Sequence, residues 1–185
     1  MDSSEINYWL EKYGQGESAF QRQTEQTLSK SIQEKGFADK NDVIEILKWK
    51  FATMKGRLKR ELNLIGPVSD QKIVDTTRAA FQNKNETERI DCLKSIKGVG
   101  NAVCSVILTF FDPANYGIFD IHVYRELFGE DPKASTYALI RFLEEIRRLS
   151  AETDLTCREV EKAVFQKNYM KLKANSTGKP LWLSF

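Results

Sequence analysis

The feature that most constrains the fold is one 35-residue stretch, LKSIKGVGNAVCSVILTFFDPANYGIFDIHVYREL, which runs from Leu93 to Leu127. Within it, Gly98 and Gly100 are followed by an apolar run that continues to Phe111. Glycine adopts positive φ angles and has no Cβ to block a close neighbour, so the pair predicts a tight turn. The stretch is therefore expected to form a hairpin of two helices, over about residues 87–112.

The turn of this hairpin is a candidate binding site for a phosphate group. Its second helix is expected to begin near Asn101, where the first backbone N–H groups have no partner inside the helix. Those donors and the positive end of the helix dipole attract anions, and a nucleic-acid phosphate can approach a glycine backbone closely. The same glycines also fit an ordinary helical hairpin that binds nothing.

An acid and the chain's only histidine follow the hairpin in the segment IFDIHVYREL, as Asp120 and His122. Aspartate is a preferred N-cap residue, so Asp120 is predicted to cap the helix that follows it. A fixed carboxylate also stabilises the oxocarbenium character of a sugar whose glycosidic bond is breaking, so Asp120 is a candidate catalytic residue too. His122 fits a structural group or a phosphate contact better than a general base.

Taken together, these residues resemble the helix-hairpin-helix DNA glycosylase superfamily with a Gly/Pro-rich loop and a catalytic aspartate (HhH-GPD). The matching pieces are Ile96 to Gly100, the helix from Asn101, the loop from Asp112 to Gly117, and Phe119 to Arg125. Asp120 lies 20 residues after Gly100, a spacing that suits the family. The match is dense over about 35 residues and vague elsewhere.

The resemblance implies an all-α fold, a two-lobed helical bundle with a helix-hairpin-helix motif. Residues 1–175 would form a single domain, with the hairpin at about 87–112 and the catalytic loop and helix at about 112–128. Residues 176–185 would be a C-terminal tail, flexible or docked on the body.

The resemblance also implies an activity: a DNA glycosylase that hydrolyses the bond between a damaged, mismatched or modified base and its sugar, with Asp120 positioning the water. Family members that also cut the DNA backbone carry a lysine two residues after the second glycine, and Ala102 occupies that position here. Without this amine a Schiff base cannot form there, so a monofunctional enzyme is expected. Lys97 stands where proline is common, which adds a positive charge at the turn.

The expected partner is double-stranded DNA with one base extruded from the helix. Candidate walls of the base pocket are aromatic, although an aromatic residue in an amphipathic helix is more often part of the core. By analogy with the family, the hairpin could hold K⁺ or Na⁺ on the backbone carbonyls of Lys94, Ile96 and Val99. The DNA-binding candidates are Lys97, Gly98, Val99, Gly100, Asn101, Ala102 and His122, and the pocket candidates are Tyr8, Trp9, Trp49 and Tyr116.

Composition fits a folded protein of 185 residues with 41% hydrophobic residues and a net charge of only +2, so a DNA-binding surface must come from local clustering. Three widely spaced cysteines favour buried free thiols and a reducing compartment, and they exclude a four-cysteine iron–sulfur cluster. No cofactor and no transition metal are expected. The chain has neither a long apolar run nor a signal-like N-terminus, so we expect a cytoplasmic (nucleoid) or nuclear monomer that is not secreted and not in a membrane.

The most basic stretch of the chain lies in a helix expected to run from Asp39 or Asn41 to about Asn63. Its charges form either a solvated face or a stripe of phosphate contacts. The basic residues are Lys48, Lys50, Lys55, Arg57, Lys59 and Arg60. Two other functions fit the sequence: a DNA-binding module without catalysis, and a helical protein-interaction domain.

Overall fold

The structure, a computed structural model, describes residues 1–175 of the chain. These residues form ten α-helices and no strand, so the predicted all-α class is confirmed. The tail predicted at residues 176–185 lies outside the described residues. The helices are α1 (Ser3–Gly16), α2 (Ala19–Lys35), α3 (Lys40–Lys50), α4 (Lys55–Ile65), α5 (Asp70–Gln82), α6 (Glu86–Lys94), α7 (Asn101–Phe111), α8 (Ile121–Phe128), α9 (Thr136–Thr153) and α10 (Cys157–Asn175).

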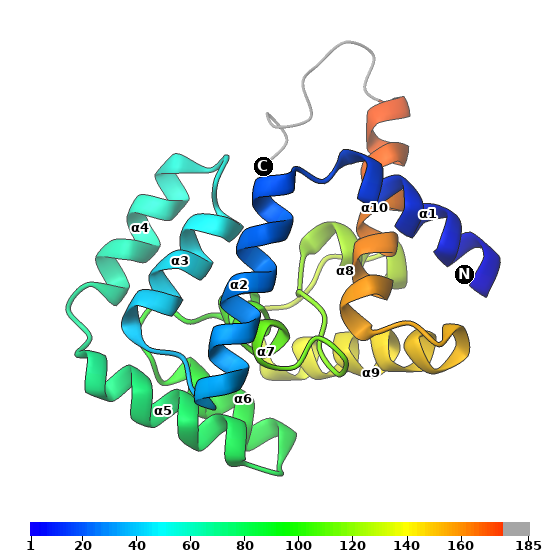
Figure 1. Cartoon of the computed structure of the whole chain (residues 1–185). Helices are drawn as coiled ribbons and strands as arrows, with labels where there is room; N and C mark the ends of the chain where they lie inside the picture. The colour runs from blue at the N-terminus through cyan, green and yellow to red at the C-terminus, as the bar shows by residue number, and fades with distance from the viewer. Residues whose placement is uncertain (176–185) are drawn as a thin grey trace.

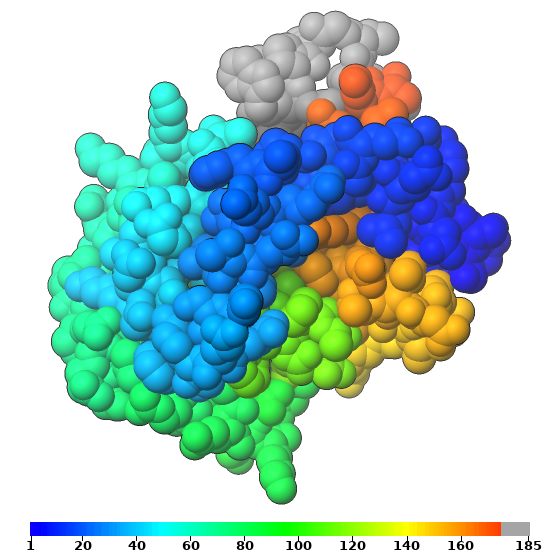
Figure 2. All heavy atoms as spheres, viewed as in Figure 1, coloured from blue at the N-terminus to red at the C-terminus, as the bar shows by residue number. Residues whose placement is uncertain are grey.

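Two helices organise the packing of the others (Figure 1). The C-terminal helix α10 packs against α1, α8 and α9, and the central helix α7 packs against α2, α3, α6 and α9. Figure 2 shows the same face in space-filling form, with the N-terminal helices lying across it. The segment between α7 and α8 therefore connects the helix at the centre to the group around α10.

Helix α7 is central because its sequence is apolar on every side. Every residue from Val103 to Phe110 is buried, including Ser105 and Thr109. A helix without a polar face removes its apolar side chains from water only when it lies in the interior, so other helices cover it on all sides. The hydroxyls of Ser105 and Thr109 donate hydrogen bonds to backbone carbonyls one turn earlier, which makes their burial tolerable.

The prediction of one helix from Asp39 or Asn41 to about Asn63 is wrong, because the structure divides this stretch into two helices, α3 and α4. Phe51 is fully buried at the C-terminus of α3, with φ −107° and ψ 25°, and the turn closes when Met54 N–H donates to its carbonyl at 2.9 Å. Burial of the Phe51 ring outweighs the helical preference of the flanking lysines. The basic stretch is therefore shared between two helices with different surroundings.

The structure also adds smaller details. The first helix of the hairpin ends at Lys94, and its N-cap is Asn85, which accepts a hydrogen bond from Glu88 N–H at 3.1 Å. The three free cysteines were expected to be buried; Cys104 and Cys157 are buried and Cys92 is half-buried. Over the described part of the chain, no helix combines the length and apolar composition needed to cross a membrane.

Candidate functional site

The two glycines of the hairpin turn have different conformations and different structural roles. Gly98 has φ +92°, and a Cβ at this position would lie 2.9 Å from Leu64 Cβ on α4. Gly100 has φ −90° and ψ −177°, which any residue can adopt, and a Cβ there would meet nothing within 4 Å. The close approach and the positive φ therefore require glycine at position 98 only, whereas we expected both glycines to need this freedom.

Helix α7 begins at Asn101, as predicted, with Gly100 as its N-cap residue. Its first hydrogen bond runs from Cys104 N–H to the Gly100 carbonyl at 2.8 Å, so the N–H groups of the three preceding residues have no acceptor within the helix. No side chain among the described residues caps this end. The N-terminus of α7 therefore presents free donors and the positive end of the helix dipole.

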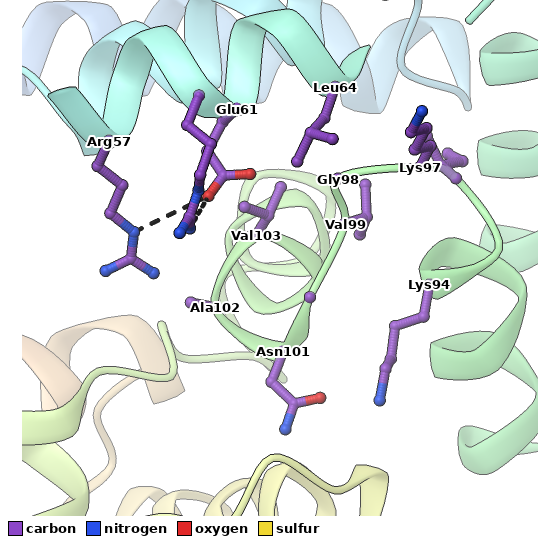
Figure 3. A pocket seen from close by; sticks show the side chains of 13 residues that line it. Arg57, Glu61, Leu64, Lys94, Lys97, Gly98, Val99, Asn101, Ala102 and Val103 are labelled. Atoms are coloured by element: carbon purple, nitrogen blue, oxygen red, sulfur yellow. Dashed lines mark hydrogen bonds and ion pairs between the residues drawn. The ribbon is translucent and has the colours of Figure 1, made fainter. Parts of the chain in front are cut away.

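A groove of about 370 Å³ lies between this helix end and α4. Figure 3 shows Arg57 extending from α4 toward the side of α7 where Ala102 lies, while Lys94 and Asn101 extend from the hairpin in a common direction. Four basic side chains line the groove, and Glu61 is the one acid among its lining residues. The basic lining residues are Arg57, Arg60, Lys94 and Lys97.

Charge in this groove is only partly neutralised. Glu61 pairs with Arg60 at 2.6 Å and with Arg57 at 4.0 Å. The side chains of Arg57 and Arg60 remain 46% and 66% exposed, so both are available to a ligand. Lys97 is exposed, and Lys94 is half-buried and donates to the Thr136 hydroxyl at 2.9 Å. The α4 part of the basic stretch therefore faces the same groove as the hairpin turn.

Asp120 is the N-cap residue of α8, as predicted, and its carboxylate accepts a hydrogen bond from His122 N–H at 2.9 Å. Its neighbour Phe119 donates its N–H to the Ser105 hydroxyl at 2.8 Å, and that hydroxyl donates to the Ala102 carbonyl at 3.0 Å. These two bonds fix the acid-bearing segment against the first turns of α7. Asp120 itself is half-buried, so its carboxylate is held in place while part of the residue stays accessible.

A second carboxylate, which could not be recognised from the sequence, contacts the segment that leads to Asp120. Glu161 on α10 is 3% exposed, is paired with Arg158, and accepts the Ile118 N–H at 3.4 Å. A Cβ at Gly117 would lie 3.0 Å from Glu161 Cβ, so the missing side chain lets the segment before α8 lie directly on α10. Arg158 also pairs with Glu25 at 2.8 Å.

Lys50, the last residue of α3, interacts electrostatically with both Asp120 and Glu161. Its Nζ lies 5.9 Å from the centroid of the Phe51 ring, and among the described residues it has no ion pair or hydrogen bond. Burial lowers the pKa of the Lys50 ammonium, the charges of Asp120 and Glu161 oppose this effect, and the net pKa lies below the ordinary value. Burial raises the pKa of the Glu161 carboxyl, although Arg158 opposes it.

The four aromatic pocket candidates come from three separate parts of the chain: α1, α3 and the segment before α8. Tyr8 is 51% exposed on α1 and stacks edge-on with Trp9, which packs on the core. Trp49 donates its indole N–H to the Gln21 carbonyl at 3.1 Å and packs edge-on against Phe110. Tyr116 is 1% exposed, with its hydroxyl bonded to Arg89 and Glu86. These contacts favour structural roles for Trp49 and Tyr116.

The other predicted site residues fall into two groups. Lys97, Gly98, Gly100, Asn101 and Ala102 line the groove together with the buried Val99. His122 is 7% exposed, and its Nδ1 lies 3.1 Å from Asn168 Oδ1, which places the ring in the interior. Of the carbonyls predicted to hold a monovalent cation, that of Ile96 accepts the Val99 N–H at 3.0 Å.

No family model, no curated protein and no solved structure matches this chain. Among the described residues there is also no group of three or more His, Cys, Asp or Glu side chains that could hold a metal ion. Two features remain to suggest a function: the basic groove at the start of α7, and the cluster of Lys50, Asp120 and Glu161, whose charges act on one another.

Proposed function

We propose that the protein is a DNA glycosylase of the HhH-GPD type, with the two-lobed arrangement that this implies. It removes a damaged, mismatched or modified base from double-stranded DNA by hydrolysis. The hairpin turn binds the phosphate backbone, and Asp120 acts on the sugar of the extruded nucleotide.

One observation carries this proposal: the acid is fixed to the same helix whose N-terminus is open to a phosphate. The Ser105 hydroxyl joins Phe119 N–H to the Ala102 carbonyl, so Asp120 and the first turn of α7 form one unit. A phosphate bound at the turn would then fix the distance between the strand and the carboxylate. Such positioning is a large part of what an enzyme contributes to a bond-breaking step.

Each part of the site has a role in the reaction. The N–H groups at the start of α7, with Arg57, Arg60 and Lys97, attract the negatively charged strand. The Asp120 carboxylate is held by the His122 N–H, so it is fixed before substrate arrives. As the base leaves, that carboxylate stabilises positive charge on the sugar and orients the attacking water.

The test is a glycosylase assay on a panel of duplexes, each with one modified or mismatched base, developed by hot alkali at abasic sites. With the substrate found in this way, Asp120→Asn should lower cleavage by about 10² to 10⁴, because the fixed negative charge is lost. Asparagine is also a good N-cap, so the fold and DNA affinity should persist. Asp131→Asn is the matched control, since Asp131 is an exposed acid just beyond α8 that pairs with Arg125.

Unchanged turnover in Asp120→Asn would remove this residue from the mechanism. A second function, a DNA-binding module without catalysis, is favoured by a different observation: the uncapped α7 and its basic groove would bind DNA with or without Asp120. That module would bind duplex with the same strong salt dependence and release no base from any member of the panel.

A further inference from the structure

We propose that the ring of Tyr137, on the first turn of α9, stacks on an unpaired base of the DNA strand whose phosphate is bound at the start of α7. The inference rests on the proposed function only in that a DNA strand occupies the basic groove. It adds α9 to the DNA-binding surface. It also names the form of DNA that fits this surface, a strand with at least one unpaired base close to the bound phosphate.

Two hydrogen bonds join the first residues of α9 to the hairpin. Asn101 Nδ2 donates to the Ser135 carbonyl at 2.8 Å, and Lys94 Nζ donates to the Thr136 hydroxyl at 2.9 Å. The Thr136 hydroxyl in turn donates to the carboxylate of Asp91 on α6 at 2.9 Å. Asn101 and Lys94 both line the groove and extend from the hairpin in a common direction (Figure 3). The N-terminus of α9 is therefore held at the edge of the groove.

Tyr137 directly follows these two anchored residues and is 73% exposed. Helix α9 buries the face that carries Ala138, Leu139 and Phe142, and at 3.6 residues per turn Tyr137 lies on the opposite face. Among residues 1–175, no other ring packs against Tyr137 and its hydroxyl makes no hydrogen bond. An aromatic ring left in water keeps a large apolar area that a ligand can cover, so this ring is available for stacking.

The charges beside the ring suit a nucleic-acid strand. Lys133, in the loop that leads to α9, is exposed. The two acids at the start of the same loop are already paired, Glu130 with Arg141 and Asp131 with Arg125. A basic side chain together with an exposed aromatic ring is the combination with which proteins bind single strands. The α9 side of the groove therefore continues the positive surface of the hairpin and adds a stacking platform to it.

The spacing along the chain sets which nucleotide the ring can reach. Consecutive Cα atoms are about 3.8 Å apart, so the Cα of Tyr137 lies at most about 7.6 Å from that of Ser135, which is bonded to Asn101. Successive bases of one strand rise by about 3.4 Å. The ring is therefore about two nucleotides from a phosphate bound at Asn101.

The base must be unpaired because stacking needs an open face. In a paired duplex the faces of each base are covered by its neighbours, and a protein meets only the base edges in the grooves. An unpaired base can turn out of the stack and place its face on an aromatic side chain. A gap or an unpaired nucleotide beside the bound phosphate supplies such a base, and a fully paired segment does not.

Fluorescence anisotropy of the full-length protein with two labelled DNAs tests this inference. One DNA is a fully paired duplex, and the other is the same duplex with a short gap that leaves unpaired bases in one strand. Wild type should bind the gapped DNA more tightly. Tyr137→Ala should weaken that binding by about 5- to 150-fold, the range that stacking of one base on an aromatic ring provides, and should change binding of the paired duplex little. Tyr137→Phe keeps the ring and should keep the affinity.

Phe20→Ala is the matched control. Phe20 is 76% exposed and is the second residue of α2, as Tyr137 is of α9, but it does not line the basic groove. A second readout uses the fluorescent base 2-aminopurine in the gap. Stacking on the ring should quench its fluorescence with wild type, Tyr137→Phe and Phe20→Ala, and not with Tyr137→Ala.

Thermal unfolding of each variant confirms that it is folded before its affinity is scored. Equal affinity of wild type for the two DNAs overturns the inference. A folded Tyr137→Ala that keeps full affinity for gapped DNA, or that loses affinity equally for both DNAs, also overturns it. Base release with no effect of Tyr137→Ala leaves the glycosylase proposal intact and removes only the role of α9. A loss confined to gapped DNA, without base release from any duplex, supports Tyr137 and removes the glycosylase proposal.

Discussion

Replacing Gly100 by serine should make the protein more stable and its binding to DNA weaker. Gly100 is the N-cap residue of α7, its φ and ψ of −90° and −177° are extended, and no atom lies within 4 Å of a Cβ built there. Ser135 caps α9 from a similar conformation, φ −122° and ψ 151°, and accepts the Ala138 N–H. A serine at position 100 would accept an N–H of α7 in the same way.

The size of the stability effect follows from two terms. Adding a serine cap in place of glycine contributes a few tenths of a kcal/mol. Removing glycine at a compatible position reduces the entropy of the unfolded chain and contributes about 0.4–1 kcal/mol. The sum is about 1 kcal/mol, which raises Tm by about 2–4 °C for a domain of this size.

The affinity effect has the opposite sign because the new hydroxyl occupies a donor that a phosphate would use. A hydrogen bond to a charged group is worth about 1.5–3 kcal/mol, so the loss of one bond should weaken DNA binding by about tenfold or more. The slope of log K against log salt should change little, because no charge is removed. Calorimetry gives Tm, and fluorescence anisotropy with a labelled duplex at several salt concentrations gives the affinity.

Gly14→Ala is the matched control for this experiment. Gly14 lies on α1, a Cβ there meets nothing within 4 Å, and alanine removes a helical glycine far from the hairpin. Its Tm should rise while its affinity for DNA stays unchanged. If Gly100→Ser gains stability and keeps full affinity, the N-terminus of α7 does not bind phosphate, and the argument for the interface fails.

Two further predictions concern stability. Gly98→Ala should destabilise the fold by about 2–6 kcal/mol in urea unfolding, the sum of backbone strain at φ +92° and overpacking against Leu64; a loss under about 1 kcal/mol would show that the hairpin can move away from α4. Burial raises the pKa of the Glu25 carboxyl, but Arg158 and Lys162 outweigh burial, so it lies below its ordinary value of 4.5. A carboxyl with a lowered pKa contributes stability above its ordinary pKa, and this stability is lost as the pH falls. In urea unfolding from pH 6 to about 3, the free energy of unfolding should therefore decline less for Glu25→Gln than for wild type. Equal declines would contradict the stabilising role of the ionised Glu25 carboxylate.

Local signals in the sequence were sufficient to predict the hairpin and the cap of α8. Gly98 and Gly100 interrupt an otherwise helical pattern, and Asp120 directly precedes a helical segment. The hairpin turn and the helix cap can therefore each be recognised from a few neighbouring residues. The central position of α7 also follows from its sequence, since an apolar run without a polar face must be surrounded.

The break between α3 and α4 could not be predicted in the same way. The turn itself, residues 51–54, contains neither glycine nor proline. It forms with Phe51 buried beneath Arg57, a tertiary effect absent from local propensity. The same limit applies to Tyr116, whose burial depends on Arg89 and Glu86, which lie 27 and 30 residues away in the chain. Periodicity identifies which residues are apolar but not which partner each will meet.

The cluster around Asp120 was missed because its members come from three distant parts of the chain, α3, the segment before α8, and α10. Only a lysine directly after a tryptophan, Trp49-Lys50, offered any local signal. Replacing a buried ion pair by apolar residues is often neutral or stabilising, so packing alone does not require Arg158 and Glu161 in this interior. In this protein the pair holds the segment that carries Asp120 through the Ile118 N–H, and its charges act on Lys50. Burial lowers the pKa of Lys50 and raises that of Glu161, so the two values move toward each other.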